Sequence, residues 1–85
     1  MTDYTAPLKN SIEYADARIR EAEQTIDQQL AAIRHDLELI EKGFDDGSGI
    51  AGRAAKLEIA LRELKMHKSN RMMFEKMLSD ELLAK

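Results

Sequence analysis

Apolar side chains recur along the first half of the chain in steps of three and four. They occupy positions 8, 12, 15, 19, 22, 26, 30, 33, 37, 40 and 44. This spacing predicts one amphipathic helix over about residues 8–42. Its most regular element is a set of five isoleucines seven residues apart: Ile12, Ile19, Ile26, Ile33 and Ile40. A seven-residue repeat is typical of helices that pack as a coiled coil, so we expect these isoleucines in the core.

The repeat changes after Ile26. Gln29 and Asp36 occupy positions that hold alanine earlier in the helix, and Leu30 and Leu37 follow one place later. A local shift of this kind relaxes a left-handed supercoil. We therefore expect the apolar surface of the first helix to widen toward its carboxyl end.

The connection between the helices is the glycine-rich segment 43–49. Gly43 should end the first helix, and Asp46 or Ser48 should cap the second. Asn10 and Glu13 have the spacing of a capping box at the start of the first helix. The second helix should cover about residues 50–83, because proline is absent from it and glycine is absent after Gly52.

Two helices of similar length and a short loop predict an all-α fold, a single antiparallel helical hairpin over residues 1–85. Pairing about the centre of the loop places residue i opposite residue 93 − i, within two. The packing surface of the second helix would then contain Leu57, Ala60, Leu61, Leu64, Phe74, Leu78 and Leu82. Arg71 interrupts this surface and should reach Glu23 or Asp27 across the hairpin.

A second apolar face is predicted nearly opposite the first on the second helix. It comprises Ile59, Met66, Met73 and Met77, and Leu39 lies outside the packing surface of the first helix in the same way. Exposed apolar faces of this kind usually mark an interface. We expect a homodimer that forms a four-helix bundle, or a different protein partner bound by the same face.

The residue composition argues against most catalytic and metal-binding chemistry. The chain has no cysteine, and its two histidines, His35 and His67, do not form the Glu-x-x-His pairs of helical di-metal sites. No nucleophile, base and carboxylate share a helix face, so we expect no enzyme activity, no cofactor and no metal. The net charge of −3 argues against non-specific nucleic-acid binding. No apolar run is long enough to span a membrane and no signal peptide is evident, so we expect a cytoplasmic protein.

Charge also differs between the halves of the chain. Residues 1–49 carry 5 basic and 11 acidic side chains, and residues 50–85 carry 8 basic and 5 acidic ones. Opposite charges on successive helices favour their pairing.

Two acidic residues, Asp45 and Asp46, fall at the predicted tip of the hairpin. In this respect the chain resembles coiled-coil transcription factors of the DksA and Gre type, which insert acidic tips into RNA polymerase, although the D-x-x-D-x-A tip of the DksA type is absent. The sequence thus leaves two functions open. One is a non-enzymatic interaction module, such as a secretion or assembly chaperone or a small phage- or plasmid-type inhibitor. The alternative is a transcription regulator that acts through its tip.

Overall fold

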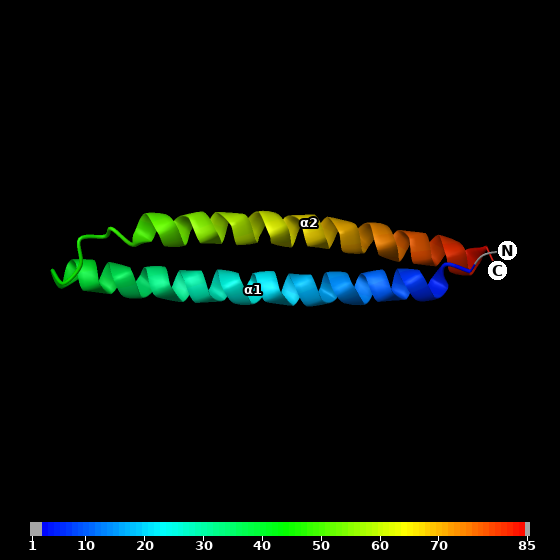
Figure 1. The fold of residues 1–85 in the computed structure, drawn as a ribbon, viewed down its shortest axis with the longest axis horizontal. Coiled ribbons are helices and arrows are strands. Elements are labelled where there is room, and N and C mark those ends of the chain that lie inside the picture. The colour runs from blue at the N-terminus through cyan, green and yellow to red at the C-terminus, as the bar shows by residue number, and fades with distance from the viewer. Residues whose placement is uncertain (1–2, 85) are drawn as a thin grey trace.

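The protein is a helical hairpin in the computed structural model, which describes residues 3–84. Helix α1 covers Thr5–Glu41 and helix α2 covers Ile50–Leu83. The helices run antiparallel along most of their length, so that the start of α1 and the end of α2 lie together, opposite the loop (Figure 1). The molecule is a rod of 67 × 14 × 13 Å. The described residues contain no strand, which confirms the all-helical fold class.

Helix α1 begins a few residues before the predicted start. The backbone N–H of Thr5 donates to Asp3 Oδ1 at 2.8 Å, which satisfies a donor that the first turn leaves unpaired. Pro7 falls within this first turn, where its missing N–H costs no hydrogen bond. The predicted cap at Asn10 is therefore wrong, because that residue already lies inside the helix.

The end of α1 follows the prediction closely. Gly43 has a positive φ of 78°, and its N–H donates to the Ile40 carbonyl oxygen at 3.0 Å. The N–H of Phe44 donates to the Leu39 carbonyl oxygen at 2.8 Å. These two bonds form a Schellman motif, which favours glycine because a side chain is strained at positive φ.

The predicted cap of α2 is wrong. Gly49 precedes the helix, and no side chain caps it. Instead, the two acidic residues stabilise the loop itself: Asp45 Oδ1 accepts the N–H of Gly47 at 2.8 Å, and Asp46 Oδ1 accepts the N–H of Ser48 at 2.9 Å. Such bonds hold an Asx turn, which competes with helix capping for the same carboxylates.

The contact between the helices (the seam) keeps a strict seven-residue repeat up to the loop. The five isoleucines of α1 are half-buried in it, and the buried residues are Leu8, Ala15, Ala22, Asp36 and Ala60. Two helices alone cannot enclose a large side chain, so the fully covered positions are mostly alanine. The predicted shift after Ile26 is wrong: Asp36 is only 6% exposed, whereas Leu37 is 49% exposed. Leu61 and Leu82, which the sequence predicts on the packing surface, are exposed, one place beyond the seam residues Ala60 and Glu81.

The register differs from the prediction by four to eight residues, or about one to two helical turns. Arg53 Nε donates to Asp36 Oδ2 at 2.7 Å, although symmetric pairing predicts residue 57 opposite Asp36. Near the chain ends, the N–H of Tyr4 donates to Glu81 Oε1 at 3.5 Å. Arg71 pairs with Asp16 across the seam, and not with Glu23 or Asp27.

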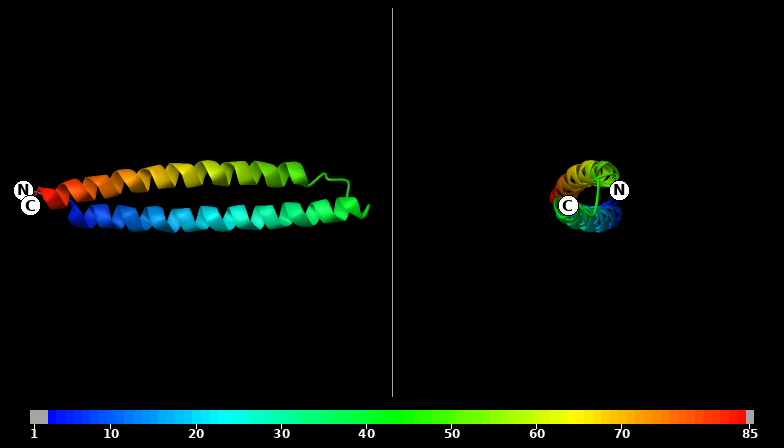
Figure 2. Two further views of the ribbon diagram at one scale, coloured as in Figure 1. Left: turned by 180° about the vertical axis from the view of Figure 1, so that it is seen from behind. Right: turned by 90° about the vertical axis from the view of Figure 1, so that its left-hand side faces the viewer.

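The path of the loop explains this shift. Helix α1 extends past the first turn of α2, and the loop returns alongside it (Figures 1 and 2). A Cβ placed on Gly47 would lie 3.3 Å from Ile40 Cδ1. The loop is therefore not centred on the hairpin end, and α2 starts nearer the middle of the rod than symmetric pairing assumes.

Candidate functional site: an apolar flank and an acidic tip

The residues predicted to bind a partner form a row along one side of α2. Ile59, Met66, Met73 and Met77 are each between 47% and 55% exposed. The first three directly precede seam residues, so they lie about 100° around the helix from the seam. We call these four residues the methionine flank. Of the four, Met66 also lines a cleft between the two helices.

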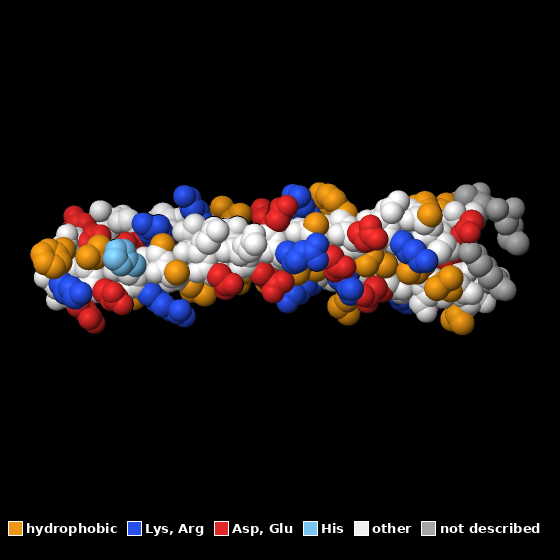
Figure 3. All heavy atoms as spheres, turned by 90° about the horizontal axis from the view of Figure 1, so that it is seen from below, with side chains coloured by type: hydrophobic (Ala, Val, Ile, Leu, Met, Phe, Trp, Pro, Cys, Tyr) orange, Lys and Arg blue, Asp and Glu red, His pale blue; other side chains and the backbone are white. Residues whose placement is uncertain are grey.

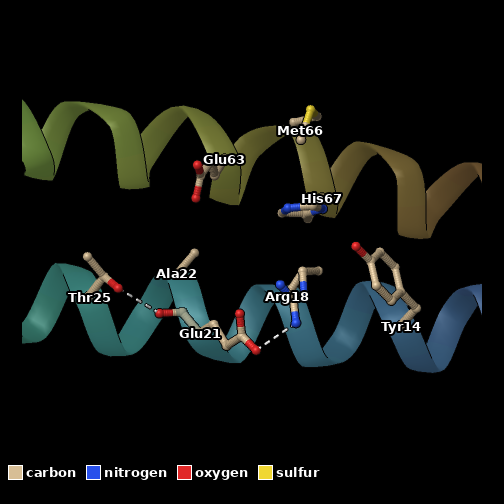
Figure 4. A pocket seen from close by; sticks show the side chains of 8 residues that line it. All are labelled: Tyr14, Arg18, Glu21, Ala22, Thr25, Glu63, Met66 and His67. Carbon is tan, nitrogen blue, oxygen red and sulfur yellow. Dashed lines mark hydrogen bonds and ion pairs between the residues drawn. The ribbon is translucent and has the colours of Figure 1, made fainter.

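Helix α1 completes this side of the rod. A shallow cleft of about 320 Å³ opens between the helices, lined by Tyr14, Arg18, Glu21, Ala22 and Thr25 from α1 and by Glu63, Met66 and His67 from α2. Ala22, a small residue that is buried in the seam, forms the floor of this cleft. In Figure 4, Glu63 and His67 point from α2 toward α1, while Met66 points outward.

Several polar groups that α1 contributes to the cleft contact other groups of the same helix. Arg18 Nη2 donates to Glu21 Oε1 at 2.8 Å, and the Arg18 guanidinium lies 5.3 Å from the centre of the Tyr14 ring. Thr25 Oγ1 donates to the Glu21 carbonyl oxygen at 3.1 Å. These contacts all lie within α1, and with Glu63 and His67 from α2 they make the lining of the cleft more polar than apolar.

The opposite side of the rod carries an ion pair that links the two helices. The Arg71 side chain extends from the seam toward this side and forms ion pairs with both Asp16 and Glu75. The hydrogen bond to Asp16 is the main cause that raises the pKa of Arg71 above its usual value. Leu37 and Leu61 are exposed on this side. Viewed from the α1 side, acidic and basic side chains alternate along the rod (Figure 3).

The tip is a separate candidate site. Phe44 is 78% exposed and lines an open concavity with Gly43, Asp45 and Asp46. The Asp46 carboxylate accepts the Ser48 N–H, and this bond lowers its pKa below the usual 3.8. The side chains at the tip are thus held in a defined arrangement at the far end of the rod.

The structure does not bring all the predicted residues together. Leu39 is half-buried near the tip, while the methionine flank runs along the rod. Tyr14 and Phe44 were not singled out from the sequence, although each is an exposed aromatic residue in a chain with few aromatics. His67 lies in the seam and lines the cleft, whereas His35 is exposed.

Two classes of site are missing from residues 3–84. No group of three or more His, Asp or Glu side chains there could hold a metal ion. Neither described helix has the long apolar segment that crossing a bilayer requires.

Comparison with known proteins gives no family. No protein-family model matches the chain, and neither does any curated protein or solved structure. Its function therefore has to be argued from its surface.

Proposed function

We propose that this chain is a non-enzymatic interaction module that self-associates, and binds a protein partner, through the methionine flank. The observation that carries the proposal is the row of four long apolar side chains, each about half exposed, in a rod where five of the described residues are buried. Methionine suits such a surface because its unbranched, polarisable side chain adapts to different partners. An assembly chaperone or a small inhibitor would use the flank in this way.

The exposed area supports association. The chain exposes 6437 Å², whereas a compact monomer of 9.7 kDa would expose about 5100 Å². The surplus of about 1300 Å² exceeds the roughly 800 Å² that each partner contributes to a standard interface. A second chain on the flank would bring the exposed area per residue close to that of an ordinary globular protein.

Charge reversal on the flank tests this proposal. The double variant Met66→Glu, Met73→Glu should reduce the mass measured by sedimentation equilibrium to that of a monomer, because a dimer would have to bury the new carboxylates. Circular dichroism should show unchanged helicity, since both side chains lie outside the seam. Met72 is 70% exposed and outside the flank, so Met72→Glu is the matched control and should leave the mass unchanged. An unchanged mass in the double variant would refute self-association through this surface.

A second function rests on the tip. Phe44 lies beside two carboxylates at the end of a stiff rod, and an exposed aromatic residue can anchor in a pocket of a partner. This arrangement supports a transcription regulator that acts on RNA polymerase. Asp45→Ala, Asp46→Ala should then abolish polymerase binding in a pull-down and leave mass and helicity unchanged. If the unmodified protein does not bind polymerase, this function is excluded.

A further inference from the structure

The five isoleucines of α1 face a row of α2 residues that repeats with the same seven-residue period. In Figure 4, Arg18 lies level with His67, and Ala22 lies level with Glu63. The isoleucines therefore face the row of α2 seam residues that contains His67. The members of that row are Arg53, Ala60, His67 and Phe74. Sliding α2 by seven residues toward the loop would place each of them against the next isoleucine, so these contacts favour neither register.

Arg71 would also meet a carboxylate after such a slide. It pairs with Asp16 in the structure. Glu23 lies seven residues further along α1, on the same side of the helix, and is exposed. An ion pair between Arg71 and an acidic residue of α1 is therefore compatible with both registers. The pairing with Glu23 is also the one that a symmetric hairpin predicts.

The ion pair between Asp36 and Arg53 is instead specific to the observed register. Arg53 Nε donates to Asp36 Oδ2 at 2.7 Å. The residue seven places beyond Asp36 is Gly43, so Arg53 would not meet a seam carboxylate after the slide. Asp36, which is only 6% exposed, would lose its charged partner. A buried carboxylate without that partner opposes the slide, so we call this ion pair the latch.

The path of the loop leaves room for the slide. The loop returns along α1, so that a Cβ placed on Gly47 would lie 3.3 Å from Ile40 Cδ1, and one placed on Gly49 would lie 3.9 Å from Asp36 Oδ2. A slide of seven residues moves α2 by about 10 Å along the rod. This movement would carry the start of α2 toward the end of α1 (Figure 1). The loop would then span a shorter distance, so it would not have to stretch.

We infer that the hairpin can adopt a second register, in which α2 lies seven residues closer to the tip, and that the latch favours the first. The slide would move Met66 from the level of Arg18 to that of Thr25, which changes the lining of the cleft. A protein that contacts both helices at the cleft would therefore bind one register more tightly and shift the population toward it. Because the loop moves with α2, binding at the cleft is coupled to the shape of the tip. The slide takes place within one chain, so it does not depend on self-association.

Cysteine pairs that differ only on α1 distinguish the registers, because the chain has no cysteine. Leu64 follows Glu63 into the seam, so Ala22→Cys with Leu64→Cys should form a disulfide in the observed register. Gln29→Cys with Leu64→Cys reports the second register. Ala15→Cys with Leu64→Cys is the matched control, since Ala15 is displaced by seven residues in the other direction. Each pair is equilibrated in a thiol redox buffer, and the oxidised monomer is measured on a non-reducing gel.

Removing the latch should populate the second register. In the background Asp36→Leu, Arg53→Leu, both leucines suit the seam in either register. The disulfide at 29 and 64, relative to that at 22 and 64, should then increase by about tenfold or more, because the slide no longer breaks a buried ion pair. The control pair should stay at its low level. The inference is overturned if the pair at 29 and 64 does not exceed the control, or if both rise together, since the latter shows a general opening of the seam.

The ion pair of Arg71 supplies an independent test. In the same leucine background, Asp16→Asn removes the partner of Arg71 in the first register only. The ratio of the two disulfides should increase about two- to fivefold, which is the effect of a partly exposed ion pair. Adding Glu23→Gln removes the partner in the second register and should restore the ratio. An unchanged ratio in Asp16→Asn, or no restoration by Glu23→Gln, would contradict a slide of seven residues.

Discussion

The buried ion pair between Asp36 and Arg53 gives the sharpest prediction about stability. Asp36 is 6% exposed, whereas the Arg53 side chain is 42% exposed. Arg53→Met therefore leaves a carboxylate in the seam without its charged donor. Breaking a buried pair in this way costs about 3–5 kcal/mol, and the access of water at one side of this seam brings our expectation to about 2–3 kcal/mol.

The converse substitution should be much milder. In Asp36→Leu the Arg53 guanidinium can turn into solvent, and the leucine fills a seam position, so we expect a loss below about 1 kcal/mol. Replacing both residues by leucine should be neutral or stabilising, because two charges no longer have to be desolvated. The asymmetry follows directly from the unequal burial of the two partners.

Urea unfolding followed by circular dichroism measures these differences. All variants must be compared at one protein concentration, because self-association would couple stability to concentration. The double-mutant cycle uses Arg53→Leu in place of Arg53→Met, so that the same two substitutions occur singly and together, and its coupling energy isolates the pair. A cost of Arg53→Met no larger than that of Asp36→Leu, or strictly additive effects in the cycle, would refute the reasoning.

Three further predictions concern single residues. Gln29 Oε1 is buried without a hydrogen-bond donor, so Gln29→Leu should stabilise the hairpin by about 1–2 kcal/mol in the same unfolding assay, whereas Gln28→Leu on the exposed side should have little effect. Gly43→Ala should cost about 1–2 kcal/mol because φ is +78° there, and a cost near zero would argue against the left-handed turn. Since the Ser48 N–H lowers the pKa of Asp46, the bond stabilises the loop above the usual value of 3.8 and is lost as the pH falls further. A lower protection factor of the Ser48 amide at low pH, which is the intrinsic exchange rate at that pH divided by the observed rate, should report that loss, and Asp46→Asn should remove this pH dependence.

The register shows most clearly what the sequence left open. The isoleucines repeat every seven residues, so sliding one helix by seven residues would preserve nearly the same apolar contacts. Charged pairs at single positions remove this ambiguity, in the way that a buried polar residue fixes register in coiled coils. In the sequence Asp36 interrupts the apolar repeat, and in the hairpin it is the residue that anchors Arg53.

The candidate site was predictable in part. Spacing alone identified Ile59, Met66, Met73 and Met77 as residues outside the packing surface, and they are exposed. Their position relative to α1 could not be predicted, because it depends on the direction in which α2 faces its partner. Only the packed hairpin shows that Tyr14 and Thr25 lie on the same side.

The sequence by itself determined that this chain forms two helices joined at Gly43, because helical periodicity and the left-handed turn depend on residues near one another. The tertiary structure decided the register and the side of the rod that carries the methionine flank. These features depend on where the loop returns along α1 and on which charges meet across the seam. Both are contacts between residues distant in the chain, and a seven-residue repeat permits several of them equally well.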